Sequence, residues 1–302
     1  MNNKILDLSF QAIGRISNVA DLVYKKAFLK KRRMLIEGSD EHDGTGVVLN
    51  EVKHIEVVYQ DEDTLFAMYD LIAHSFWRSQ EFSLFLQNIK LLIPPIADFG
   101  CGDGSFASVL LKKIDYGIDI DEEALKIAAG YGIYNKIILS ENNTIPMADG
   151  SVNSVFSNSV LEHTFDLETM LSEINRIIAS GGYFIFSVPV SRFTDDFAKY
   201  FGVAASDRAN RQAYHRNLFD ADWWRTTIER YGFEIVSIRH YQPDWFTFYY
   251  WMSRFIDKMA VVNKGIKSFI WKQCKASAIN MIKTSIKDTK QGANIFIIAK
   301  KR

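Results

Sequence analysis

Short apolar runs alternate with amphipathic stretches through the middle of the chain. The runs that read as strands lie at 96–99, 116–120, 136–139, 154–157 and 183–188. Between them, apolar residues recur at helical spacing, for example at 122–130 and 167–179. Apolar strands that alternate with helices predict a parallel sheet covered on both faces, with ligands bound at the carboxyl ends of the strands.

Two more strand-like runs, 233–241 and 293–301, follow this alternating region. If they pair as an antiparallel hairpin, the residues between them form an insertion at the sheet edge. The expected fold class is therefore α/β: a doubly wound, Rossmann-like sheet of seven mostly parallel strands, with helices on both faces and an antiparallel last strand.

The same pattern divides the chain into three parts. Residues 1–75 are expected to be a helical and loop appendage, 76–243 together with 292–302 the core, and 244–291 a helical insertion. Apolar side chains at helical spacing over 76–93 predict a helix that stops at Pro94-Pro95.

Charge is distributed unevenly along the chain. The 302 residues have no formal net charge, yet residues 251–302 hold twelve Lys and Arg against two Asp and Glu. A second basic cluster, KKAFLKKRR, occupies 25–33 and suits either a phosphate contact or a solvated helix face. Such asymmetry points to an anionic partner, with nucleic acid, a lipid surface and an anionic substrate all eligible.

Cysteine and histidine usage bears on the compartment and on metal binding. The two cysteines are Cys101 and Cys274, and a disulfide at the first would obstruct the glycine loop in which it lies. A reduced, cytoplasmic setting is expected. The chain has no CxxC or HExxH string and its six histidines are scattered, so no metal site is expected.

The chain also carries a membrane-like window at 245–262. Three charged residues interrupt it, and it falls short of the roughly 20 apolar residues that a membrane span needs. The amino terminus lacks the continuous apolar run of a secretory signal. Any membrane attachment is expected to be peripheral, on the inner face.

The stretch IADFGCGDGSFA, 96–107, places a glycine-rich turn between a strand and a helix. Glycines let backbone N–H groups approach a ligand, and the helix start adds partial positive charge. Gly100, Gly102 and Gly104 form G-x-G-x-G, with Asp98 two residues before the first, rather than the G-x-G-x-x-G of dinucleotide sites. The spacing disfavours NAD.

A carboxylate follows at the end of the second expected strand. Asp119 comes 19 residues after Gly100, where it can accept both hydroxyls of a ribose. The alternative is that Asp119 and Asp121 only cap the helix that starts near Glu122. We expect Asp121 to cap and Asp119 to bind ribose.

Further along, the chain reads ENNTIPMADGSVNSVFSNSVLEH and then EINRIIASGGYFIFSVP. With the glycine loop and Asp119, these motifs stand in the order and at the distances of the class I S-adenosylmethionine-dependent methyltransferases, which the chain resembles over about 94–190. YHRNLF…DWW, followed by ERYGFEIVSIRHY, is similar to methyltransferases of bacterial polysaccharide and lipid-linked sugar synthesis.

The resemblance implies S-adenosylmethionine as the cofactor and a role for each matching residue. Gly100, Cys101 and Gly102 would pass its methionine part, and Asp98 would lie near the ammonium group. The remaining implied contacts are Asp119 to the ribose, Ile120 and the Asn142 backbone to the adenine ring, Glu141 to the adenine amino group, and Asn158 beside the transferable methyl. Glu141 departs from the family's usual Asp.

Two histidines are candidates for a general base that takes the proton of an acceptor hydroxyl. His163 follows the fourth expected strand in LEHTFD, and its alternative role is to order that loop. His215 lies where the acceptor lid usually forms, or it makes a structural hydrogen bond. Tyr214 and Arg216 would shape the acceptor pocket, Arg216 by pairing with a carboxylate or phosphate.

The expected function is methyl transfer to a hydroxyl of a small-molecule, sugar or lipid-linked glycan acceptor. Aromatic residues at 245–251 form an acceptor lid or part of the core, and the lysines after 258 form a lipid-binding or a solvated helix face. The alternatives are a quinone or lipid-like acceptor, a nucleic-acid-interacting protein that uses the basic tail, and a cofactor-binding protein without turnover.

Overall fold

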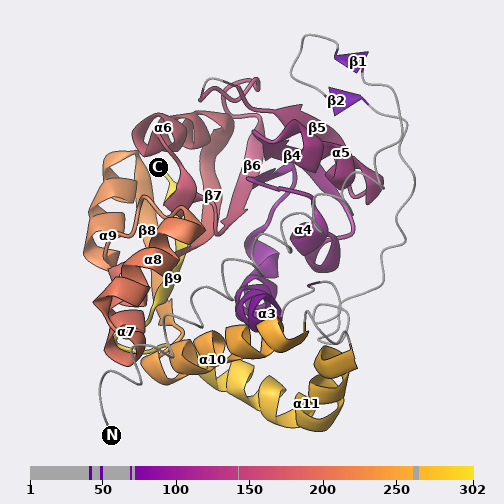
Figure 1. Cartoon of the computed structure of the whole chain (residues 1–302). Coiled ribbons are helices and arrows are strands. Elements are labelled where there is room, and N and C mark those ends of the chain that lie inside the picture. The colour runs from indigo at the N-terminus through magenta and orange to yellow at the C-terminus, as the bar shows by residue number, and fades with distance from the viewer. Residues whose placement is uncertain (1–40, 43–47, 50–68, 70–71, 142, 261–264) are drawn as a thin grey trace, which may run out of the picture.

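The computed structural model describes residues 41–42, 48–49, 69, 72–141, 143–260 and 265–302 (Figure 1). Most of the expected appendage 1–75, including the basic cluster at 25–33, lies outside the described residues, as does Asn142. Two short strands of this part, β1 (Glu41–His42) and β2 (Val48–Leu49), pair antiparallel.

A seven-stranded sheet forms the centre of the described chain, in the order β5-β4-β3-β6-β7-β9-β8. Only β9 runs antiparallel to its neighbours β7 and β8, which confirms the predicted fold class. The strands are β3 (Ile96–Phe99), β4 (Ile114–Asp119), β5 (Tyr134–Leu139), β6 (Val152–Asn158), β7 (Ile178–Pro189), β8 (Phe233–Tyr241) and β9 (Asn294–Lys301).

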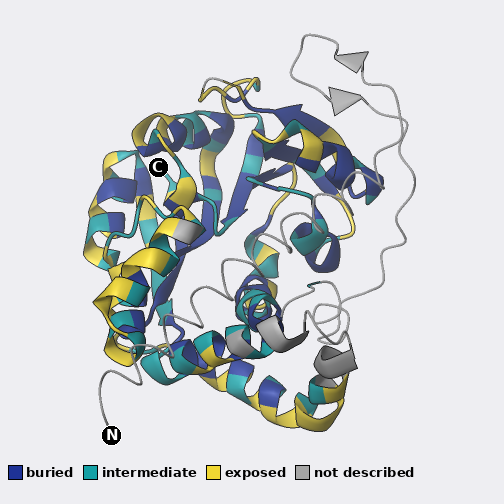
Figure 2. Ribbon diagram, viewed as in Figure 1, coloured by how far each residue is buried: buried dark blue, intermediate teal, exposed yellow. Residues whose placement is uncertain are grey.

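Alternating side chains of the central strands supply both faces of the sheet. Phe184 and Phe186 belong to one buried cluster and Ile185 to the other, as the period of two in a strand requires. Helices α6 (Leu167–Ile177) and α9 (Ala221–Arg230) cover the first face. Helices α3 (Ile72–Gln87) and α4 (Ser105–Leu110) cover the second, and Figure 2 shows the buried sheet between these layers.

Helix α3 differs from the prediction at both ends. It begins at Ile72 and ends at Gln87, and a single 3-10 turn, η1 (Ile89–Leu91), connects it to the prolines. The Asn88 side chain donates to the Leu84 carbonyl at 2.8 Å and so satisfies one of the last helical acceptors. The helix therefore stops before the prolines are reached.

Helix α5 (Glu122–Gly130) follows β4 and packs on β4 and β5. Strand β7, which follows β6 and α6, begins at Ile178, five residues earlier than expected. Its pairing with β6 shifts register between Val152 and Ser154, which accommodates the polar turn before Tyr183. An irregularity of this kind has no signature in the apolar pattern.

Two helices, α10 (Asp244–Ala260) and α11 (Gly265–Ser285), connect β8 to β9 (Figure 1). The Asp257 carboxylate of α10 accepts hydrogen bonds from the Ile72 and Ala73 N–H groups at 2.6 and 3.0 Å. It thereby caps the amino terminus of α3. Within the described residues, no helix has the length and apolar character to cross a membrane.

The strand order reverses between β3 and β6. From β3 the chain adds β4 and β5 on one side and then returns to place β6 and β7 on the other. The loops after β3 and β6 therefore flank the position at which ligands bind in open α/β sheets. These two loops carry the glycine-rich turn and the LEH motif.

Candidate active site

The loop after β3 keeps three glycines at positive φ, namely Gly100 at 74°, Gly102 at 54° and Gly104 at 75°. The Gly100 and Cys101 N–H groups both donate to the Ile118 carbonyl of β4, at 2.8 and 3.0 Å. This anchors the loop to the neighbouring strand. A side chain at these positions would be strained because L residues rarely adopt such φ values.

The glycines of this loop face different surroundings. A Cβ on Gly100 would meet the Val160 side chain at 2.3 Å, whereas a Cβ on Gly102 would meet nothing within 4 Å. Gly100 is therefore needed for packing against the segment after β6. Gly102 borders open space, so its backbone is accessible to a ligand.

Asp119 occupies the carboxyl end of β4 and faces the same loop. One carboxylate oxygen accepts from the Gly102 N–H at 2.7 Å. The other accepts from the Ile120 and Asp121 N–H groups at 2.8 and 2.9 Å. Burial raises the pKa of Asp119, and these backbone hydrogen bonds act against the rise.

Helix α5 is capped by Asp121, as predicted, because its side chain accepts from the Ala124 N–H at 3.1 Å. Asp119 is thus not the cap of this helix. Next to it, Ile120 is 78% exposed and presents an apolar surface to solvent. A carboxylate beside an exposed apolar side chain suits a nucleoside, which has a polar sugar and a flat apolar base.

Asp98 lies buried in β3 and accepts a hydrogen bond of 2.7 Å from the Tyr134 hydroxyl. Burial raises the pKa of Asp98 to about 7, and the negative charge of Asp119 adds to the rise, whereas the Tyr134 hydrogen bond opposes it. Burial also raises the pKa of the Cys101 thiol, which keeps it protonated. Neither Tyr134 nor its contact was identified from the sequence.

The other predicted cofactor residues follow β5 or end β6. Glu141 is exposed after β5 and bridges to Thr144, while its neighbour Asn142 lies outside the described residues. Asn158 ends β6, and both ends of its amide are engaged. It donates to Glu81 at 2.9 Å and accepts from the Ser187 hydroxyl at 2.7 Å.

Glu81 is a site residue that the sequence analysis missed. Its carboxylate, on α3, is fully buried and accepts from Trp77, Arg78, Asn158 and Ser159. The Arg78 guanidinium donates to it at 2.7 Å. One signal in the sequence could have identified Glu81: it stands beside Phe82 on the apolar face of the helix. An acid buried there needs polar partners, which marks it as a candidate site residue.

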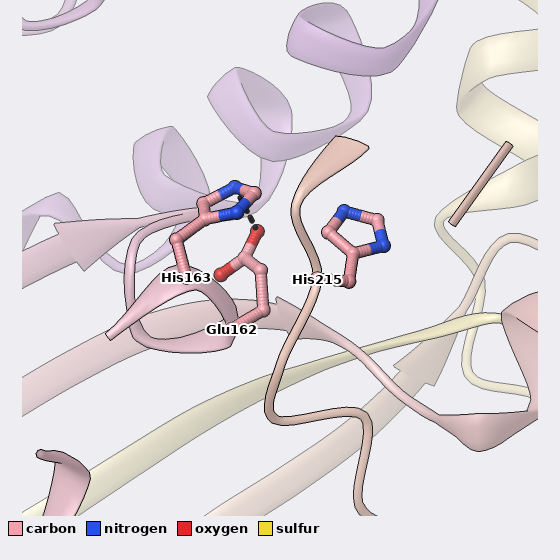
Figure 3. Close-up of side chains that lie close together, drawn as sticks. All are labelled: Glu162, His163 and His215. Atoms are coloured by element: carbon pink, nitrogen blue, oxygen red, sulfur yellow. Dashed lines mark ion pairs between the residues drawn. The ribbon is translucent and has the colours of Figure 1, made fainter. Parts of the chain in front are cut away.

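His163 and His215 come from distant segments and lie side by side, with ring centroids 5.2 Å apart (Figure 3). His163 belongs to the 3-10 turn η2 (Leu161–His163) after β6, and His215 follows α8 (Val203–Ala213). Partial burial lowers the pKa of His163 and lowers that of His215 to about 4. Both rings are therefore neutral at pH 7.

Glu162 joins this pair and was not among the predicted site residues, although LEH contains it. One of its carboxylate oxygens lies 3.6 Å from His163 Nε2, and the residue is 1% exposed. Burial raises the pKa of Glu162 to about 8. The cluster thus combines one buried acid with two neutral imidazoles.

The predicted acceptor residues Tyr214 and Arg216 flank His215. Tyr214 is 65% exposed and ends α8 at a φ of 57°. The Arg216 guanidinium stacks on the exposed ring of Phe165, with its central carbon 3.9 Å from the ring centre. Arg216 is thus at the surface beside the histidine cluster.

Aromatic side chains surround the other side of His215. Phe193 of α7 (Ser191–Phe201) contacts the His215 ring edge to face at 5.5 Å. Trp77 of α3 and Trp251 of α10 in turn contact Phe193. Trp224, by contrast, packs on Phe186 in the main core, so the aromatic residues near the carboxyl terminus do not form a single surface.

Residues 97–186 match the protein family described as "Methyltransferase domain". A malonyl-[acyl-carrier protein] O-methyltransferase of Yersinia pestis is 30% identical over 150 residues, which are 49% of this chain and 54% of the relative. An uncharacterized methyltransferase of Mycobacterium sp. (strain KMS) is 26% identical over 50% of this chain and 66% of its own length.

The chain covers between 36% and 66% of the length of such curated relatives. Among solved structures, it is similar to a SAM-dependent methyltransferase from Thermotoga maritima, described as a possible histamine N-methyltransferase. That likeness has 17% identity and a TM-score of 0.48, over 80% of this chain and all of the other.

Proposed function

Residues 97–186 match the methyltransferase domain family, and from this premise we propose that the chain is a class I S-adenosylmethionine-dependent methyltransferase that transfers a methyl group to a hydroxyl of a sugar, lipid-linked glycan or other small-molecule acceptor. One observation carries the proposal. The open glycine loop and the histidine cluster occupy adjacent loops at the reversal of the sheet, joined where Val160 packs on Gly100.

S-Adenosylmethionine is the cofactor of this domain, and the residues around the glycine loop fit it. Asp119 would accept the ribose hydroxyls, and the exposed side chain of Ile120 would pack on the adenine. The Gly102 backbone borders the space for the methionine part, where no Cβ intrudes. Glu141 and Asn142 are assigned to the adenine edge, and Asn158 to the methyl end.

Asp98 is assigned to the ammonium group of the cofactor. A buried carboxyl with a pKa of about 7 in the free protein becomes fully ionised when a cation lies beside it. The cofactor, once bound, supplies a methyl group on a sulfonium centre. The contribution of the protein is to align the acceptor oxygen with that methyl group and to exclude water.

The acceptor hydroxyl must lose its proton as its oxygen bonds to the methyl carbon and the carbon–sulfur bond breaks. His163 and His215 are assigned to receive that proton because both rings are neutral and lie in the turn after β6 and the segment facing it. A positioned base contributes roughly 10²–10⁴-fold to such a step. The sulfonium becomes a neutral thioether.

Aromatic and basic side chains beside the histidines suit a glycan. Arg216, next to His215, offers a cation for a carboxylate or phosphate, and the exposed ring of Phe165 beside it offers an apolar surface for a sugar. A second candidate, a quinone or lipid-like acceptor, is favoured by the exposed apolar side chains Tyr249, Met252 and Phe269 of α10 and α11.

Peripheral attachment to an anionic membrane would bring a lipid-linked acceptor to the site. The side chains of Lys272, Lys283, Lys287 and Lys290 are exposed on α11 and the segment after it. Each basic residue near an anionic lipid surface contributes about 1 kcal/mol. Sedimentation with anionic vesicles and with RNA, each at two salt concentrations, separates this attachment from nucleic-acid binding.

The test is release of S-adenosylhomocysteine during incubation with lipid-linked, nucleotide-sugar and nucleic-acid fractions. We expect turnover with one of the first two fractions. His163→Ala and His215→Ala should reduce turnover about 100-fold with little change in cofactor affinity by calorimetry. His240→Ala, on β8, is the matched control. Full turnover by both cluster variants contradicts the general-base role, and cofactor binding without turnover in any fraction contradicts the activity.

A further inference from the structure

Glu162, His163 and His215 bring one candidate metal-ligand atom each to within 4.8 Å of one another. Figure 3 shows the Glu162 carboxylate next to the His163 ring, with the His215 ring on a neighbouring segment. The two segments are 52 positions apart in sequence, which is why scattered histidines gave no motif. The expectation of no metal site took account only of close spacing along the chain.

Both histidines have one ring nitrogen held by an oxygen acceptor. His163 Nδ1 lies 3.3 Å from the Tyr214 carbonyl oxygen, and His215 Nδ1 lies 3.0 Å from Asn210 Oδ1. Because these oxygens only accept, each Nδ1 carries the hydrogen and each Nε2 keeps its lone pair. This is the arrangement that orients histidine ligands in metal sites.

Glu162 supplies a buried carboxylate with unused capacity. Its Oε2 atom is buried and has no hydrogen-bond partner among the described residues. The Arg78 guanidinium pairs with Glu81, at 2.7 Å, and not with Glu162 in any ion pair of the described residues. A buried carboxylate oxygen that receives no hydrogen bond is stabilised by a cation beside it.

Backbone contacts hold the two ligand-bearing segments against each other. The Arg216 and Asn217 N–H groups donate to the Glu162 carbonyl at 2.7 and 3.1 Å. The Asn217 side chain donates to the Leu161 and Thr164 carbonyls at 2.8 and 2.7 Å. Four hydrogen bonds to backbone carbonyls therefore fix the position of the two segments that carry the ligands.

We propose that Glu162, His163 and His215 form a three-ligand site for a divalent transition-metal ion such as Zn²⁺, with one coordination position open. Two imidazoles, one carboxylate and an open position are the donor set of catalytic zinc sites. Ligands of tetrahedral zinc lie roughly 3.3–3.5 Å apart. The 3.6 Å between Glu162 and His163 is close to this, and the candidate ligand atoms of all three residues lie within 4.8 Å of one another.

The ion deepens the proposed function, and this part of the inference rests on it. The acceptor oxygen would take the open position, where the metal lowers the pKa of the hydroxyl so that its proton passes to water before the oxygen bonds to the methyl carbon. The histidines then act as ligands instead of bases.

Metal binding is measured on the full chain after removal of metals with a chelator, by calorimetry with Zn²⁺ and by the visible absorption of Co²⁺. We expect one ion per chain. Glu162→Gln and His215→Ala should each weaken binding at least 10-fold, whereas His240→Ala should bind like the wild type. Circular dichroism and calorimetry with S-adenosylhomocysteine confirm that each variant is folded.

The outcomes separate the two proposals. Absence of stoichiometric binding, or equal binding by wild type and both cluster variants, overturns the site. Stoichiometric binding that the variants lose, with no turnover on any acceptor fraction, supports the site and contradicts the proposed function. Full turnover by the metal-free chain overturns the role of the ion in the reaction while the proposed function stands.

Discussion

The two loops at the reversal of the sheet differ in how far the chain satisfies its own polar groups. After β3 and β4, the Asp119 carboxylate accepts three backbone N–H groups, and Asp98 accepts the Tyr134 hydroxyl. After β6, the buried Glu162 keeps an oxygen without a hydrogen-bond partner among the described residues. The polar groups of the first loop are therefore satisfied by the chain itself, whereas the second loop holds a buried carboxylate oxygen that is not.

The largest effect on stability is expected at Gly100, where the loop after β3 packs against Val160 of the segment after β6. Gly100→Ala should lower the free energy of unfolding by about 3 kcal/mol, because a positive φ and a Cβ overlapping Val160 add together. Gly102→Ala is the matched control, with the same backbone conformation and open space, and should lower it by about 1 kcal/mol. Urea unfolding measures both, and equal losses would contradict the packing role of Gly100.

The next effect tests the carboxylate at the end of β4. Asp119→Asn should weaken S-adenosylhomocysteine binding about 30-fold, since a charged hydrogen bond contributes about 2 kcal/mol. Asp121→Asn should leave the affinity unchanged because asparagine caps a helix as well as aspartate does. Calorimetry compares the two variants, and similar losses would mean that Asp119 acts only through helix α5.

The pH dependence of cofactor binding should report Asp98. Its pKa of about 7 in the free protein means that lowering the pH through 7 protonates the carboxyl and removes the partner of the cofactor ammonium group. Affinity should therefore fall by up to about 10-fold per pH unit below 7. Asp98→Asn should abolish this dependence. Tyr134→Phe should move its midpoint to higher pH, because the Tyr134 hydrogen bond lowers the pKa of Asp98.

The same raised pKa affects stability with a defined sign. The folded chain holds the Asp98 proton more tightly than the unfolded chain, so this residue favours folding at low pH. Its contribution is lost as pH rises from about 4 to about 7. Unfolding free energies of wild type and Asp98→Asn across that window should diverge with pH, and parallel curves would contradict the assignment.

The smallest effect should come from the surface beside the histidines. Arg216→Ala removes the stacking on Phe165 and should cost about 0.5 kcal/mol of stability, since the pair is exposed. If Arg216 contacts the acceptor, KM for the acceptor rises several-fold while cofactor affinity is constant. Arg225→Ala, exposed on α9, is the control. An unchanged KM would contradict the acceptor role of Arg216.

The local pattern of apolar and polar residues predicted which helices and strands form better than it predicted where they begin and end. The strands 96–99 and 233–241 and the helix 122–130 coincide with β3, β8 and α5, because period and turn chemistry act over a few residues. The predicted start of β7 was wrong, because the irregular first part of this strand depends on its pairing with β6. The end of α3 was wrong as well, because Asn88 stops the helix through a side-chain hydrogen bond.

The residues of the candidate site were likewise predictable only where their interactions are local in sequence. Asp121 was identified as a cap because its partner is three residues away. Glu81 was not identified, because it meets Asn158 across 77 positions, and no local signal reports that distance. The juxtaposition of His163 and His215 likewise depends on where β6 and α8 end in space. The assigned roles of the cofactor and acceptor residues stay predictions.

The connection from β8 to β9 leaves and re-enters the sheet at neighbouring positions, since Tyr241 and Asn294 are direct partners in the ladder. A short turn would join these strands equally well. A change in the length or sequence of the α10–α11 connection would therefore leave the glycine loop in place. Asp257 of this connection caps α3, and α3 carries Glu81, which accepts a hydrogen bond from Asn158. A change in the connection would therefore also alter how Asn158 is held at the proposed methyl end of the site.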